Sequence, residues 1–274
     1  MMPSEGQVTM EYETIVIDVT DDGVATVTLN RPEVLNSFNR RMCAEFAQFW
    51  ERARTDSAIR AIVLRATGDR AFCTGVDVTE LLVEDDAFLD PEHPWNEGSD
   101  PGTQLSPKRN NVWKPVVAAV HGMCAGGAAY LIGECDIVIC EPGATFFDPH
   151  VNYGLVAALE PIMLSYKMSR SAALRIALLG LNERMSADRA LVSGLVTEVV
   201  PIGQLHARAH QLAATIAALP PVAVQGTVKA FWQSLNLGRD QALSSALMFT
   251  QIGNPIATVG LDRSQAKRVE PRIY

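Results

Sequence analysis

The sequence predicts an α/β fold with a β-rich N-terminal core and a helical C-terminal third. Short apolar runs typical of buried strands recur between residues 14 and 140, and glycine-containing turns join several of them to segments with helical spacing. After Pro161 the pattern is helical, with breaks at Gly180, Ser186 and Pro201. A chain of 274 residues with 48% hydrophobic residues is long enough for one large α/β domain or two small ones.

The first elements follow from alternation and spacing. Residues 14–20 alternate as a strand, and an Asp-Asp-Gly turn leads into a second strand at 24–29. Apolar residues recur at helical spacing from Ser37 to about Asp56, and residues 61–65 form a short buried strand. These segments predict a β-β-α-β order.

Two later segments share one plan, an apolar strand followed by a glycine turn and then a helix. They are "AIVLRATGDRAFCTGVDVTEL" (61–81) and "PVVAAVHGMCAGGAAYLIGE" (115–134). Each turn leaves unpaired N–H groups at the start of a helix, and two such ends that converge bind one oxyanion from two sides. The alternative is that both are plain strand-to-helix turns. Neither is a Walker loop, because no Gly-Lys-Ser/Thr follows the glycines.

Residues 84–111 are polar and rich in Pro, Gly and Asp, which predicts a long loop of the kind that forms lids or binding segments. A further strand is expected at 136–140.

Composition limits the partners and the compartment. A net charge of −8 argues against non-specific binding of nucleic acid or of an anionic membrane. The N-terminus lacks an apolar signal region, and no apolar run approaches the ~20 residues of a membrane span. We therefore expect a cytoplasmic protein with no nucleic-acid or membrane partner. Reduced, buried thiols fit that expectation, since no CxxC pair occurs among Cys43, Cys73, Cys124, Cys135 and Cys140.

Four segments in order carry a family resemblance. They are "VATVTLNRPEVLNSFN" (24–39), "RAFCTGVDVTEL" (70–81), "KPVVAAVHGMCAGGAAYLIGECDIVI" (114–139) and "GLNERMSADRALVSGLVTEVVP" (180–201). With them the sequence resembles the crotonase superfamily, also called the enoyl-CoA hydratase/isomerase family. The resemblance implies a crotonase-type spiral of ββα units over residues 12–201 and a helical C-terminal oligomerisation region over 202–274.

The resemblance also implies a ligand and a site. The ligand is an acyl-CoA thioester, and the backbone N–H groups of Val76 and Gly127 form the oxyanion hole for its carbonyl. No metal or redox cofactor is implied, and the assembly is a homotrimer or a dimer of trimers. The groove for the adenine and pantetheine groups is lined by Leu35, Ser37, Thr74 and Val78, with Val76 between them.

The chain departs from the family's hydratases at both catalytic glutamates. The positions that match them hold Tyr130 and His150. A tyrosine, whose ordinary pKa is about 10, does not replace a carboxylate as a base at neutral pH. A standard hydratase mechanism is therefore in doubt, and the acid/base set is expected to be non-standard.

The stretch "ATFFDPHVNYGLVAALEP" (144–161) supplies the other candidates. His150 is the first choice for proton transfer, and Asp148 would share its face of an extended strand. Glu160 lies where a helix is expected to begin, near positions from which other branches of the family present a carboxylate. Each has a plainer interpretation: Asp148 as a turn acceptor, Glu160 as a helix-start charge and Tyr130 as a pocket wall.

The sequence leaves three functions open. The leading one is an enoyl-CoA hydratase/isomerase-like lyase that forms a thioester enolate. The second is a hydrolase that cleaves a carbon–carbon bond of a β-dicarbonyl substrate, since one branch of the family resembles this chain in having a histidine at position 150. The third is an acyl-CoA-binding protein without catalysis.

Overall fold

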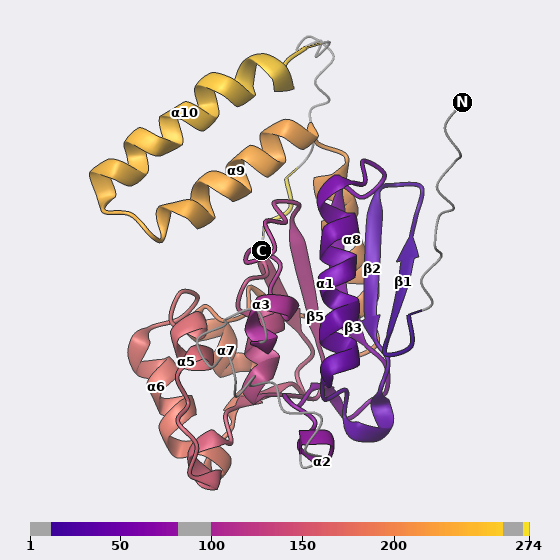
Figure 1. Cartoon of the computed structure of the whole chain (residues 1–274), viewed down its shortest axis with the longest axis vertical. Helices are drawn as coiled ribbons and strands as arrows, with labels where there is room; N and C mark the ends of the chain where they lie inside the picture. Colours follow the sequence, from indigo (N-terminus) through magenta and orange to yellow (C-terminus); the bar gives the residue numbers. More distant parts are fainter. Residues whose placement is uncertain (1–11, 82–99, 260–270, 274) are drawn as a thin grey trace, which may run out of the picture. The chain divides into compact units, whose positions relative to one another are not determined.

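The computed structural model describes residues 12–81, 100–259 and 271–273, which fall into two compact units (Figure 1). The first unit ends at Ala218 and the second begins at Leu219. Our predicted core ended earlier, at residue 201. The difference is helix α8 (Leu205–Ala217), which buries Leu205, Ala209 and Ala213 in the same apolar cluster as strand residues. The role of the C-terminal region in oligomerisation stays a prediction.

The larger sheet of the first unit has six strands in the order β1-β2-β3-β5-β7-β10. Only β1 and β2 pair antiparallel; the other neighbours are parallel. The strands are β1 (Ile15–Val19), β2 (Val24–Leu29), β3 (Ala61–Ala66), β5 (Val116–Val120), β7 (Ile137–Cys140) and β10 (Glu198–Val199).

Helix α1 (Arg40–Thr55) covers one face of this sheet and α8 covers the other (Figure 1). Successive strand residues point to opposite faces. Thus Ile62 and Leu64 belong to the cluster that includes α1, whereas Ala61 and Val63 belong to the cluster that includes α8. Burial on both faces explains why the central strands read as continuous apolar runs.

A second, smaller sheet carries the glycine loops. Its strands, in spatial order, are β4 (Ala71–Cys73), β6 (Met123–Ala125), β8 (Thr145–Phe147) and β9 (Met185–Ser186). The first three are parallel, so their carboxyl ends lie at one edge of the sheet. This sheet was not predicted, because three residues are too few to show alternation.

Short helices lie in the connections between strands, and two longer ones complete the first unit. Of the predicted loop 84–111, residues 82–99 lie outside the described residues, and α3 forms in the remainder. The short helices are η1 (Pro32–Val34), α2 (Val78–Leu81), α3 (Pro101–Leu105), η4 (Gly126–Ala128), α4 (Ala129–Ile132), η5 (His150–Tyr153), α5 (Leu159–Leu164) and η6 (Gly180–Asn182). The longer ones are α6 (Arg170–Leu179) and α7 (Ala187–Ser193).

The second unit contains α9 (Pro221–Ser234) and α10 (Arg239–Ala257), which pack against each other. No residue of either helix is buried, and a cavity of about 560 Å³ lies between them. Among the described residues, no single helix meets the length and hydropathy required to cross a membrane, although α8 and α9 meet them when they are taken together across their break.

Candidate active site

Three loops that follow the parallel strands β4, β6 and β8 meet at one cavity of about 240 Å³. Ligand sites of α/β proteins commonly lie at the carboxyl ends of parallel strands, because the loops there converge. Both predicted glycine turns contribute to its wall, together with the 144–161 stretch. The lining residues are Phe38, Thr74, Gly75, Val76, Val78, Pro101, Gly126, Gly127, Tyr130, Pro149, His150, Tyr153, Leu155 and Glu160.

The two glycine loops touch through their backbones. Gly75 has φ +88°, and a Cβ there would lie 3.0 Å from the amide nitrogen of Gly127. A Cβ on Gly127 would lie 2.7 Å from a ring carbon of Phe38. The positive φ and the nearby backbone therefore require glycine at position 75, whereas a Cβ at position 127 would displace the Phe38 ring. Gly127 lies in the first turn of η4, where backbone N–H groups have no partner within the helix.

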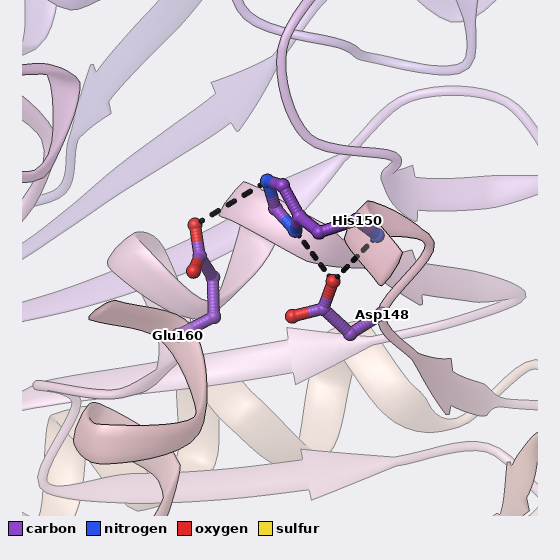
Figure 2. A group of neighbouring side chains, drawn as sticks. All are labelled: Asp148, His150 and Glu160. Atoms are coloured by element: carbon purple, nitrogen blue, oxygen red, sulfur yellow. Dashed lines mark hydrogen bonds and ion pairs between the residues drawn. The ribbon is translucent and has the colours of Figure 1, made fainter. Parts of the chain in front are cut away.

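Asp148 and His150 form a hydrogen-bonded pair (Figure 2). Strand β8 ends at Phe147, so the pair does not share a strand face as expected. Instead, one carboxylate oxygen, Oδ1, lies 2.5 Å from His150 Nδ1 and accepts the His150 backbone N–H at 3.0 Å. A local turn between residues two apart therefore orients the imidazole, with Nε2 directed away from Asp148 and toward Glu160.

Glu160 lies in the first turn of α5 and is almost fully buried, with 4% of its surface exposed. Its Oε1 atom is 3.8 Å from His150 Nε2 (Figure 2). The same oxygen accepts a 2.5 Å hydrogen bond from the hydroxyl of Tyr130 on α4. Burial with two polar neighbours favours a functional role over a solvated helix-start charge.

The surroundings raise the pKa values of two of these side chains, His150 and Tyr130. The hydrogen bond that His150 donates to Asp148 is the main cause that raises the pKa of His150; burial opposes it, and the charges of Asp148 and Glu160 add to it. Burial raises the pKa of Tyr130 far above its ordinary value, and the nearby Glu160 charge adds to the shift. Tyr130 is thus a neutral hydrogen-bond donor, and His150 keeps its proton to higher pH than an ordinary histidine.

The cluster offers two kinds of chemistry. Asp148, His150 and Glu160 each present one potential metal-ligand atom, all within 4.8 Å of one another. Two of the available atoms are already engaged, however: Asp148 Oδ1 bonds His150 Nδ1, and Glu160 Oε1 accepts from the Tyr130 hydroxyl. As it stands, a carboxylate-supported imidazole beside a second carboxylate is suited to donating and accepting protons.

Of the four residues predicted to bind coenzyme A, two line the cavity and two do not. Thr74 and Val78 line the cavity, whereas Leu35 and Ser37 are not among its lining residues. Ser37 is buried and its hydroxyl donates to the carbonyl of Val34. The assignment of these four residues to a coenzyme A groove stays a prediction.

Sequence reasoning missed the role of Asn36. Its backbone is in the left-handed region, with φ +54°, and its side chain is buried. It accepts from the Arg31 amide at 2.9 Å and donates to the carbonyls of Thr67 and Ala71 at 2.9 Å each. Asparagine tolerates this conformation better than most residues. The Leu-Asn pair of the first motif was therefore the available signal.

The cysteines beside the site are structural. Cys73 and Cys124 are partners in the β4–β6 register. Burial raises the pKa of Cys73 to about 12 and raises that of Cys124 well above its ordinary value. Neither thiol is therefore activated as a thiolate.

Comparison with known proteins gives the same family along most of the chain. Residues 19–254 match the family described as enoyl-CoA hydratase/isomerase. An (E)-benzylidenesuccinyl-CoA hydratase of Thauera aromatica is 32% identical, over 84% of this chain and 85% of its own. A 1,2-epoxyphenylacetyl-CoA isomerase of Escherichia coli is also 32% identical, over 85% and 86%.

Solved structures agree. An enoyl-CoA hydratase/isomerase from Mycobacterium paratuberculosis has a TM-score of 0.80 and 37% identity, covering 91% of this chain and 97% of that chain. A structure described as a putative enoyl-CoA hydratase, from Streptomyces coelicolor, has a TM-score of 0.80 at 27% identity, covering 97% and 94%. The crotonase-type α/β fold predicted from the sequence is confirmed.

Proposed function

Because the chain belongs to the enoyl-CoA hydratase/isomerase family, we propose that it catalyses an acid/base reaction of an enoyl-CoA thioester with His150 and Glu160 as the proton-transferring pair. One observation carries the proposal. His150 Nε2 and Glu160 Oε1 lie 3.8 Å apart on the wall of the same cavity that Val76 and Gly127 line.

In the proposed reaction, the backbone N–H groups of Val76 and Gly127 hold the thioester oxygen. They stabilise the negative charge that develops there as the enolate forms, and one such donor is typically worth ~10²–10³ in rate. Support comes from the contact between the two glycine loops, which brings both backbones to one cavity.

The acid/base pair acts at the Cα–Cβ double bond of the substrate. One member removes a proton from water, and the hydroxide adds to Cβ while the double-bond electrons move into the enolate. The other member then protonates Cα. The raised pKa of His150 makes it suited to the second role and leaves Glu160 as the base. Without water, the same pair moves a proton between carbons and isomerises the double bond. Asp148 holds the imidazole, and Tyr130 holds Glu160.

The test is turnover of crotonyl-CoA by the wild type, by His150→Ala and by His210→Ala. His210 is an exposed histidine paired with Asp22, so its variant controls for the loss of an imidazole elsewhere. We expect His150→Ala to lose on the order of 10²–10⁴ in kcat, which is typical of a general acid/base, while His210→Ala keeps its rate. An unimpaired His150→Ala variant would refute the assignment.

The Asp148–His150 bond also favours a second candidate, hydrolysis of a carbon–carbon bond in a β-dicarbonyl thioester. A carboxylate-oriented imidazole is the arrangement that activates a nucleophile for attack on a carbonyl. With acetoacetyl-CoA, hydroxide would add to the β-ketone, and the Cα–Cβ bond would break toward the thioester enolate. Protonation of that enolate then leaves acetate and acetyl-CoA. Formation of these products by a protein inert to crotonyl-CoA would favour this candidate. Binding of both esters without turnover of either would favour a non-catalytic acyl-CoA-binding protein.

We further propose a homotrimer or a dimer of trimers in the cytoplasm, acting without a metal or redox cofactor. The assembly is supported by large exposed apolar side chains on η5 and α5 and by the absence of buried residues in α9 and α10. The compartment is supported by five buried free cysteines. A mass from light scattering equal to one chain would contradict the assembly.

A further inference from the structure

The described wall of the active-site cavity contains no lysine or arginine beside its one carboxylate, Glu160. Its ionisable lining residues are Tyr130, His150, Tyr153 and Glu160, and none of the other described lining residues is Lys or Arg. Arg31 lies close by but its guanidinium is paired with Asp77 at 3.0 Å and with Glu80 at 2.7 Å. The site therefore depends on its own cluster for charge.

That cluster is negative in total. Asp148 and Glu160 flank the two ring nitrogens of His150. With a protonated imidazole and two carboxylates, the three side chains sum to −1. Moving the shared proton from His150 to Glu160 leaves the same sum, and loss of that proton makes it −2. The Nε2 proton therefore faces Glu160 and does not make the cavity cationic (Figure 2).

The remaining wall is mainly apolar. Phe38 and Val78 contribute apolar side chains to it, and so do Tyr153, the last residue of η5, and Leu155 just after that helix. A carboxylate placed among these groups would lose water and meet like charge, and both effects weaken binding. An apolar group would gain contact without either cost.

We infer that the acyl group that this site accepts is uncharged and mainly apolar, and that acyl groups ending in a carboxylate are rejected. The inference rests on the proposed function, since it takes the cavity to hold the acyl end of a coenzyme A thioester. It concerns charge selection by Glu160 and Asp148, which is separate from their part in proton transfer.

Three saturated thioesters of matched length test it without turnover: butyryl-CoA, succinyl-CoA and succinamoyl-CoA. The last replaces the carboxylate with a neutral amide of nearly the same size. Calorimetry on the full-length protein should give succinyl-CoA a dissociation constant at least tenfold higher than that of succinamoyl-CoA. Glu160→Gln, or Asp148→Asn if the first variant does not fold, should reduce that ratio at least threefold. Glu183→Gln removes an exposed carboxylate paired with Arg175 and should leave the ratio unchanged.

Equal binding of succinyl-CoA and succinamoyl-CoA to the wild type would overturn the inference and leave the proposed function standing. A ratio that Glu160→Gln and Asp148→Asn both leave unchanged would also overturn it, because the selection would then lie elsewhere. Failure of all three esters to bind would overturn the proposed function, and this inference with it.

Discussion

Replacing Asp148 with asparagine isolates the effect of one charge on the proposed acid/base group. The side chain keeps its shape, and its remaining oxygen still accepts from His150 Nδ1, which lies 2.5 Å away in the wild type. A hydrogen bond to a charged group contributes ~1.5–3 kcal/mol and a neutral one ~0.5–1.5 kcal/mol. The charged form of the imidazole thus loses about 1–1.5 kcal/mol of stabilisation relative to the wild type. Asp148→Asn should therefore lower the pKa of His150 toward its ordinary value.

The pH dependence of kcat/KM measures this shift, because it reports the ionisations of the free enzyme. The limb that belongs to His150 should move to lower pH, whether the residue acts as an acid or as a base. An NMR titration of the His150 ring reads the same pKa without turnover. Asp22→Asn is the matched control, since Asp22 lies 2.9 Å from His210 and not at the site.

The raised pKa of His150 also determines how its contribution to folding stability changes with pH. A group whose folded pKa lies above its unfolded value stabilises the fold fully below the unfolded pKa, and this contribution is lost as pH rises through the folded pKa. Asp148→Asn should therefore remove part of the stability of the wild type on the acidic side of neutrality. A limb that stays in place, or moves to higher pH, would refute the role given to Asp148.

Three further variants and one treatment test other parts of the site. Gly75→Ala should lower kcat about 100-fold by crowding the Gly127 amide, and Gly203→Ala, with φ +80° and open space around it, should not. Asn36→Ala should lower the free energy of unfolding in urea by about 3 kcal/mol, because three hydrogen bonds are lost. Tyr130→Phe should lower kcat/KM about tenfold, because Glu160 loses a donor; an unchanged value would contradict its positioning role. Dialysis against EDTA should leave crotonyl-CoA turnover unchanged, and its loss on dialysis with recovery on added metal would contradict the metal-free proposal.

Most of the larger sheet could be predicted because its strands are long enough to show a pattern. The strand at 24–29 was predicted at the bounds observed for β2, and the helix beginning at residue 37 proved to be α1 from Arg40. The intervening Asn39 is the N-cap, whose side chain accepts from the Met42 amide, so the apolar spacing extended the helix by three residues too many.

The sequence was enough to name the candidate residues of the site, but not to predict which of them contact one another. His150 and Asp148 are two apart in sequence, so their association could be suspected. The 2.5 Å contact between Tyr130 and Glu160 spans 30 positions and depends on how α4 packs against α5. No local pattern contains that information. The burial of Glu160 likewise comes from tertiary packing, whereas its position at a helix start suggested exposure.

The turn that joins Asp148 to His150 has a consequence for how the site responds to motion. Since one carboxylate oxygen binds both the backbone and the ring of His150, their separation is set within three consecutive residues. Glu160 belongs to another element, α5, ten residues further along the chain. A shift of α5 would change the 3.8 Å distance between the imidazole and Glu160. The 2.5 Å distance between the imidazole and Asp148 would stay constant. The distance between His150 and Asp148 is thus fixed by the local turn, whereas the distance between His150 and Glu160 depends on the position of α5. Motion of this one short helix would therefore govern the timing of proton transfer.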